Sequence, residues 1–85
     1  MITFEYIITD KEGIHARPAG QLIREAKKYA SSVTIRCKDK TADAKRLLAV
    51  MSLAAKCGDT VTVNCEGADE EVAAVNLKAF LQANL

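Results

Sequence analysis

The sequence predicts an α+β fold in which a four-stranded antiparallel sheet is covered on one face by three helices, as an open-faced β-sandwich. Segments with alternating apolar residues and segments with helical periodicity follow one another in the order β-α-β-β-α-β-α. Each strand-like segment has only one apolar face, which is typical of an antiparallel sheet covered on one side. The 85 residues contain no linker or repeat, so we expect a single domain over residues 1–85.

The first strand is predicted at residues 1–9, where alternate positions are apolar (Ile2, Phe4, Tyr6 and Ile8). A polar turn over residues 10–13 follows. The first helix is expected to begin directly after His15, and its apolar residues recur at helical spacing (Ala19, Leu22, Ile23 and Ala26). Pro18 falls in its first turn, where a missing N–H group costs nothing.

The middle of the chain predicts two strands and a short helix. Residues 32–37 alternate as a strand, and a tight turn leads to a short strand over residues 41–44. Residues 47–55 favour a short helix. We expect Gly58 to act as its C-terminal stop, because glycine readily adopts the conformation that ends helices.

The last third predicts one more strand and one more helix. Residues 60–66 alternate as a strand. Asp69, Glu70 and Glu71 indicate a helix start, since the helix dipole favours carboxylates there. An apolar stripe along this helix faces the core (Ala73, Leu77, Phe80 and Leu81).

The net charge is only +1, which argues against a strongly basic nucleic-acid-binding protein. Residues 1–56 hold 11 Lys and Arg against 6 Asp and Glu, a net +5. Residues 57–85 hold 1 against 5, a net −4. This asymmetry predicts a basic surface that meets an acidic partner.

No segment indicates membrane insertion or secretion. The longest apolar run, residues 47–55, is about half of what a membrane span needs. No signal peptide is visible, so we expect a cytoplasmic protein. Cys37, Cys57 and Cys65 are odd in number and lack a C-x-x-C spacing, so we expect reduced thiols, with Cys37 and Cys65 packed in the core. No metal or cofactor site is expected.

The most informative segment is residues 13–19, which contains His15, the only histidine of the chain. Gly13 allows a close turn, and His15 falls at the N-cap of the predicted helix. The free N–H groups of a helix start bind anions, and Arg17 adds a planar cation suited to phosphate oxygens. The same positive field favours an unprotonated imidazole with a free lone pair. This combination suits a histidine that accepts a phosphoryl group.

The sequence resembles the HPr family, the histidine-containing phosphocarriers of the bacterial phosphoenolpyruvate–sugar phosphotransferase system. The resemblance rests on GIHARPAG at residues 13–20 and extends over the whole chain. It includes KTADAKRLLAVMSLAAKCGDTV in the middle and EGADEE near the end.

The resemblance implies that His15 accepts phosphate on Nδ1, the pros nitrogen, from phosphorylated enzyme I. It then passes the phosphate to IIA domains or subunits of sugar permeases. Arg17 would stabilise the phosphate, together with the backbone N–H groups of Ala16 and Arg17. The protein is then a phosphocarrier without an independent turnover, rather than an enzyme.

The resemblance also implies a docking surface for these partners on the first two helices. Its matching positions are Ala16, Arg17, Gly20, Arg24, Lys27, Leu47, Leu48 and Met51. Family members regulated by HPr kinase have a serine where this chain has Arg46, so that regulation is not expected here. We hypothesise that Arg46 joins the basic docking face near His15.

Other functions remain open at this point. The chain could be a nitrogen-branch phosphocarrier or a relative with one dedicated partner, since the histidine chemistry is the same. It could also be a regulatory protein-binding module, but relatives of that kind lack the histidine. A small nucleic-acid-binding domain is disfavoured by the near-neutral charge and by the 5% aromatic content. A carrier that presents His15 to two partners in turn is expected to be a monomer.

Overall fold

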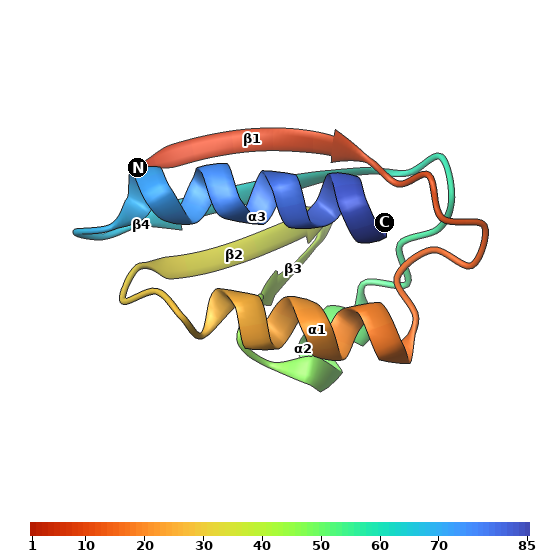
Figure 1. The fold of residues 1–85 in the computed structure, drawn as a ribbon. Coiled ribbons are helices and arrows are strands. Elements are labelled where there is room, and N and C mark those ends of the chain that lie inside the picture. The colour runs from red at the N-terminus through yellow and green to blue at the C-terminus, as the bar shows by residue number, and fades with distance from the viewer.

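The seven elements follow one another in the predicted order, which confirms the fold class (Figure 1). The structure is a computed structural model and describes residues 1–85. The elements are β1 (Ile2–Ile7), α1 (Ala16–Ala26), β2 (Ser32–Cys37), β3 (Lys40–Asp43), α2 (Leu47–Ser52), β4 (Thr60–Glu66) and α3 (Glu70–Asn84). No helix among them is long and apolar enough to span a membrane.

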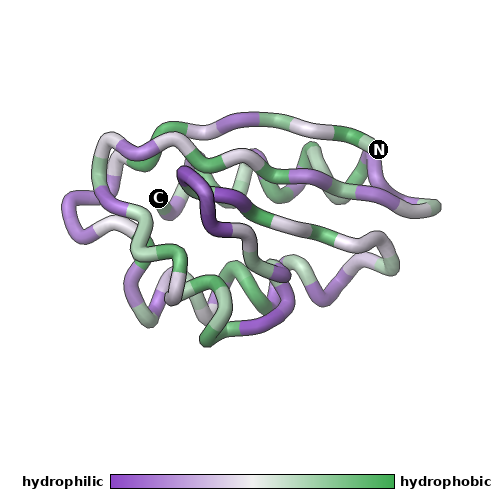
Figure 2. Tube along the Cα trace, turned by 180° about the vertical axis from the view of Figure 1, so that it is seen from behind, coloured by the Kyte–Doolittle hydropathy of each residue, from purple (hydrophilic) through white to green (hydrophobic).

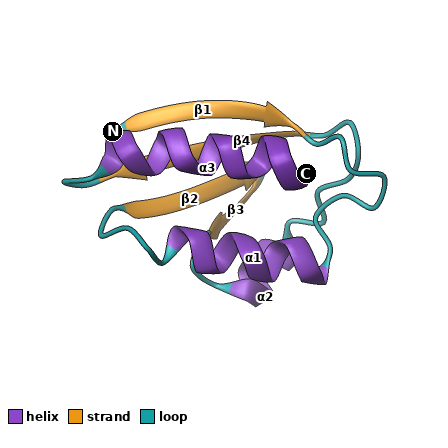
Figure 3. Ribbon diagram, viewed as in Figure 1, coloured by secondary structure: helices purple, strands orange, loops and turns teal.

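The sheet has the strand order β1-β4-β2-β3, and all its neighbours are antiparallel (Figure 3). Its register places Phe4 beside Val63, Val63 beside Ile35, and Ile35 beside Ala42. This apolar row therefore crosses all four strands on the helix-covered face. Figure 2 shows how hydrophilic and hydrophobic residues alternate along the strands. Successive side chains of a strand point to opposite faces, so this alternation gives the sheet one apolar face.

The opposite face of the sheet is polar. Thr3, Asn64 and Thr34 occupy neighbouring positions in the row next to the apolar one. The Thr3 hydroxyl donates to Asn64 Oδ1 at 2.7 Å. This face can remain in water, as the sequence pattern predicted.

The three helices lie on the apolar face, where α3 packs against β1 and β4, and α1 packs between α3 and α2 (Figure 1). The largest fully buried side chains between these layers are Ile8, Ile35, Leu77 and Leu81. Cys37 and Cys65 are buried in this core as predicted, and burial raises the pKa of both thiols. Cys57 is exposed.

Helix α2 ends earlier than the sequence predicted. It stops at Ser52, and Gly58 does not terminate it. Instead, Ala54 adopts a positive φ of 53° directly after the helix. The physical reason is a tertiary contact: the Ala55 carbonyl accepts the Ile14 N–H at 3.0 Å, and a longer helix would carry this carbonyl away.

The start of α3 is tied to the start of β2 through Asp69. Its carboxylate accepts the backbone N–H groups of Ala30 and Ser31, each at 2.9 Å, and the Ser31 hydroxyl. Asp69 sits at the predicted N-cap position but makes no side-chain hydrogen bond to its own helix. The hydrogen bonds from the Ser31 hydroxyl and the Ala30 N–H hold the pKa of Asp69 below its usual value.

This carboxylate predicts a specific pH dependence of stability. The pKa of Asp69 is lower in the folded chain than its ordinary value of 3.8, so the carboxylate stabilises the fold above that pH. The contribution is lost as the pH falls through the folded pKa. We therefore expect Asp69→Asn to lower the free energy of unfolding near neutral pH, and the difference from wild type to shrink in acid. Urea unfolding over a pH series measures this.

Glu71→Gln is a matched control, because it removes the exposed carboxylate of a neighbouring residue that accepts no hydrogen bond. It should leave the pH dependence close to that of wild type. If the free energies of unfolding of wild type and Asp69→Asn differ by the same amount down to strongly acidic pH, the role given to the Asp69 charge is contradicted.

Gly20 lies inside α1 without a structural need for glycine. No atom lies within 4 Å of the position where its Cβ would be. Alanine loses less conformational entropy than glycine in a helix, so Gly20→Ala should stabilise the protein by about 0.5–1 kcal/mol. Urea or thermal unfolding checks this, and a loss of stability would show that the helix does not accommodate the methyl group.

Candidate functional site

His15 lies at the junction of a loop and a helix, as predicted. It is the N-cap of α1, with extended backbone angles, and its side chain makes no capping hydrogen bond. The ring is 37% exposed. The imidazole is therefore held at the surface and is free for chemistry.

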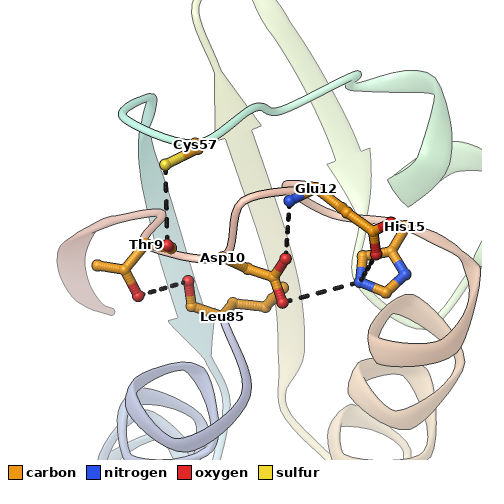
Figure 4. A network of polar contacts seen from close by, with 6 residues as sticks. All are labelled: Thr9, Asp10, Glu12, His15, Cys57 and Leu85. Atoms are coloured by element: carbon orange, nitrogen blue, oxygen red, sulfur yellow. Dashed lines mark hydrogen bonds and ion pairs between the residues drawn. The ribbon is translucent and has the colours of Figure 1, made fainter.

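The loop that carries His15 is fixed by backbone hydrogen bonds to two distant segments. The N–H groups of Thr9 and Asp10 donate to the Leu85 main-chain oxygen at 2.6 and 2.8 Å, and the Thr9 hydroxyl donates to it as well (Figure 4). On the other side, the Ile14 N–H donates to Ala55. These contacts hold the start of α1 against the end of α3 and the segment after α2.

Gly13 is required by this close approach. Its φ of +68° lies in the left-handed region that favours glycine. A Cβ added to it would lie 2.3 Å from the Ala55 carbonyl oxygen. The sequence-based expectation of a close turn at Gly13 is therefore confirmed, and its cause is the packing of one backbone against another.

The first turn of α1 offers an anion-binding site. The backbone N–H groups of Ala16 and Arg17 make no hydrogen bond within the chain, and Pro18 has no N–H group. The first turn contains no acidic residue. Arg17 is exposed and takes part in no ion pair. Two free donors, the positive end of the helix dipole and a free guanidinium thus lie next to the His15 position.

Two carboxylates that the sequence analysis did not single out face the imidazole. The Nε2 atom of His15 lies 3.4 Å from Glu12 Oε2 and 3.7 Å from Asp10 Oδ2. Nδ1 makes no hydrogen bond or ion pair, and Figure 4 shows it on the far side of the ring from Asp10. The spacing of Asp10 and Glu12 before His15 was visible in the sequence, but only the turn of the loop directs both toward the ring.

The arrangement distinguishes the two ring nitrogens chemically. Nε2 is flanked by negative charge, which repels an incoming phosphoryl oxygen. Nδ1 is unpartnered, and the ring stands at the positive end of α1. The geometry therefore suits a nucleophilic Nδ1 whose product, a phosphorylated imidazole, is stabilised by backbone N–H groups and a guanidinium.

The residues expected to form a docking surface lie on neighbouring helices. Ala16, Arg24 and Lys27 are exposed and Gly20 is half-buried, all on α1 or at its end. On α2, Leu47, Leu48 and Met51 are all exposed, with Leu48 reaching 80%. The contact between α1 and α2 places exposed apolar side chains beside basic ones, a composition found in transient interfaces.

The hypothesis that Arg46 joins the basic docking face stays a prediction, and the structure gives the local contacts of this segment. The neighbouring Lys45 donates from Nζ to the Tyr29 carbonyl at 2.9 Å, just beyond the C-terminal end of α1. Arg46 itself is exposed, with Nε 3.9 Å from Asp43 Oδ2. Arg46 is the N-cap of α2, directly before Leu47 of the expected docking surface.

Comparisons with known proteins give a consistent result. The family model described as "PTS HPr component phosphorylation site" matches residues 2–83. The phosphocarrier protein HPr of Lysinibacillus sphaericus is 42% identical over 81 residues, which cover 95% of this chain and 92% of that protein.

Solved structures agree. The histidine-containing phosphocarrier protein of a mycoplasma matches with a TM-score of 0.94 at 38% identity, over 96% of this chain and 93% of that chain. Crh, a catabolite repression protein of Bacillus subtilis described as a dimer with a swapped domain, matches with a TM-score of 0.79 at 33% identity, over 100% of this chain and 98% of that chain. Sequence, fold and histidine site together show that the chain belongs to the HPr family of phosphocarrier proteins of the phosphotransferase system.

Proposed function

We propose that His15 accepts a phosphoryl group from phosphorylated enzyme I and passes it to IIA domains of sugar permeases. One observation carries this proposal: an exposed imidazole with an unpartnered Nδ1 stands at the start of a helix whose first N–H groups are free. Membership of the phosphocarrier family supports the choice of donor and acceptor.

The transfer needs only what this site offers. The Nδ1 lone pair of His15 attacks phosphorus, a P–N bond forms, and the bond between phosphorus and the donor breaks. The N–H groups of Ala16 and Arg17 donate hydrogen bonds to the phosphoryl oxygens, and the Arg17 guanidinium offsets their charge. The reverse sequence of events delivers the group to an acceptor. The protein is thus a transiently phosphorylated carrier without a turnover of its own.

A phosphotransfer assay tests this proposal. The full chain is mixed with enzyme I, Mg²⁺ and labelled phosphoenolpyruvate, and an IIA protein is added afterwards. We expect label that is stable in alkali, labile in acid, and lost from the chain when the acceptor is added. Absence of label with an enzyme I that phosphorylates another HPr would overturn the carrier function and favour the regulatory binding module instead. A comparison of sugar-branch and nitrogen-branch partners distinguishes the two carrier alternatives.

The docking surface gives a second expected result. Arg24 is exposed on α1, and its reversal to glutamate should repel acidic partners. We expect Arg24→Glu to lower the kcat/KM of phosphoryl transfer about tenfold at low salt, with a smaller effect at high salt because ions screen surface charges. Rapid-quench measurements of phosphoryl transfer from enzyme I at several salt concentrations give these values of kcat/KM.

Lys78→Glu is the matched control, since it reverses an exposed basic residue on α3, outside the proposed surface. An equal loss of kcat/KM in both variants would mean that the net charge of the chain, rather than a local surface, governs its encounter with enzyme I. The same assay on Arg46→Ser tests whether Arg46 contributes to docking from its position at the N-cap of α2.

The proposal further includes a cytoplasmic monomer, because a carrier exposes the same histidine to two partners in turn. The dimer described for Crh belongs to that protein. Light scattering at the concentrations of the transfer assay checks the state of this chain. A stable dimer at these concentrations would overturn the proposal that the chain is a monomer.

A further inference from the structure

We infer that Asp10, Glu12 and His15 form a binding site for a zinc-like divalent cation. The three residues each offer one donor atom, and these atoms all lie within 4.8 Å of one another. Figure 4 shows both carboxylates turned toward the same nitrogen of the ring. This inference stands on the geometry and does not depend on the proposed phosphocarrier function.

Two of the three distances between donor atoms are close to the spacing that Zn²⁺ requires, and the third lies within 4.8 Å. Zn–N and Zn–O bonds of about 2.0–2.2 Å in a tetrahedral site separate the ligand atoms by about 3.3–3.6 Å. The separations from His15 Nε2 are 3.4 Å to Glu12 Oε2 and 3.7 Å to Asp10 Oδ2. Glu12 is 74% exposed, so its side chain is free to rotate toward Asp10 and complete the set. The fourth position faces solvent and would hold water.

The charges at this position call for a cation. Neither Asp10 nor Glu12 forms an ion pair with a lysine or arginine; their only ion-pair partner is the imidazole. Two carboxylates therefore converge on a single imidazole nitrogen. A divalent cation between the three groups would balance both carboxylates and use the ring nitrogen as a neutral ligand.

The donor set favours Zn²⁺ over Mg²⁺. Imidazole nitrogen is a good ligand for zinc and other late first-row metals, whereas Mg²⁺ prefers six oxygen ligands and keeps its waters. The ring is also already oriented, since His15 is fixed at the start of α1 and Asp10 is fixed by the hydrogen bond of its N–H to Leu85. Of the three ligands, the exposed Glu12 side chain is the one that the metal would have to order.

The site is tested by titrating the full chain with ZnCl₂ and, separately, with MgCl₂. Calorimetry gives the stoichiometry, and ¹⁵N NMR of the imidazole identifies the coordinated nitrogen. We expect one Zn²⁺ per chain, bound through Nε2 of His15, and no comparable binding of Mg²⁺. Absence of zinc binding, equal binding of both cations, or coordination through Nδ1 would overturn the site.

Variants separate this site from other zinc ligands. Glu12→Gln should weaken Zn²⁺ binding about tenfold or more. Because Glu12 is exposed, this substitution should not disturb the folding of the chain. Glu5→Gln, which removes the same charge from the open face of the sheet, should leave the affinity unchanged. Cys57→Ser should do so as well, and loss of binding in that variant would assign the metal to the exposed thiol instead.

A consequence for phosphoryl transfer rests on the proposed function. Zinc on Nε2 of the neutral ring would leave the imidazole proton on Nδ1, which then has no free lone pair to attack phosphorus. Added ZnCl₂ should then slow labelling of the wild-type chain more than labelling of Glu12→Gln, with each rate compared to the same variant without zinc. Equal slowing of both would overturn this consequence, whereas a chain that is never labelled but still binds zinc would overturn only the carrier function.

Discussion

Replacing His15 by alanine is expected to abolish labelling from phosphoenolpyruvate through enzyme I. The substitution removes the only imidazole of the chain, and with it the proposed nucleophile. Folding should be little affected, because the ring is half-exposed and makes no capping hydrogen bond. We expect the free energy of unfolding to change by no more than about 0.5 kcal/mol, as for ordinary surface substitutions. Labelling and urea unfolding of the same preparation measure both quantities.

The acceptor nitrogen can be identified in the same experiment. The NMR spectrum of the phosphorylated wild-type chain should show phosphate on Nδ1, since Nε2 faces the carboxylates of Asp10 and Glu12. Label that persists in His15→Ala would place the acceptor on another residue. Phosphate on Nε2 would contradict the assignment of the two nitrogens.

Replacing Gly13 by alanine should be the most damaging small substitution in the loop. A non-glycine residue pays about 1–2 kcal/mol for the left-handed conformation that Gly13 adopts, and overpacking adds about 1–3 kcal/mol. The new Cβ would lie 2.3 Å from the Ala55 oxygen, so backbone must move. We expect a loss of about 2–5 kcal/mol in the free energy of unfolding.

The loss should also be visible in function, because the same backbone contact positions the start of α1. We expect Gly13→Ala to slow labelling of the fraction that remains folded. For the unfolding measurement, Gly20→Ala is the matched control: the same methyl group is added seven residues later, where there is open space. Similar unfolding curves for the two variants would mean that the contact with Ala55 is not a tight one.

The local structure of the chain was largely predictable from the sequence. The period of two predicts which residues of each strand share the apolar face. The strand order that lines up Phe4, Val63, Ile35 and Ala42 is a result of tertiary pairing. The start of α1 was predictable because Pro18 and the apolar spacing agree. The end of α2 was not, because the bond between Ile14 and Ala55 joins segments far apart in the chain and overrides the local helical preference.

In the candidate site, too, the local features were predictable from the sequence and the tertiary ones were not. His15, Gly13 and Arg17 were identified from residue types and their order, since helix starts bind anions whatever the fold. Asp10 and Glu12 were missed, although both precede His15 by only a few residues. Sequence spacing in a loop does not say where side chains point, whereas in a helix or strand it does.

By itself, the sequence determined the seven elements, the apolar face of the sheet and the histidine at the start of a helix. These depend on local preferences and on periodicity, which act within a few residues. The tertiary structure alone decided where α2 ends, why Gly13 must be glycine, and that two carboxylates face Nε2. The first two depend on backbone hydrogen bonds and packing between segments that are distant in sequence. The third depends on the path of the loop, which contacts with Leu85 and Ala55 hold in place, and no local pattern carries that information.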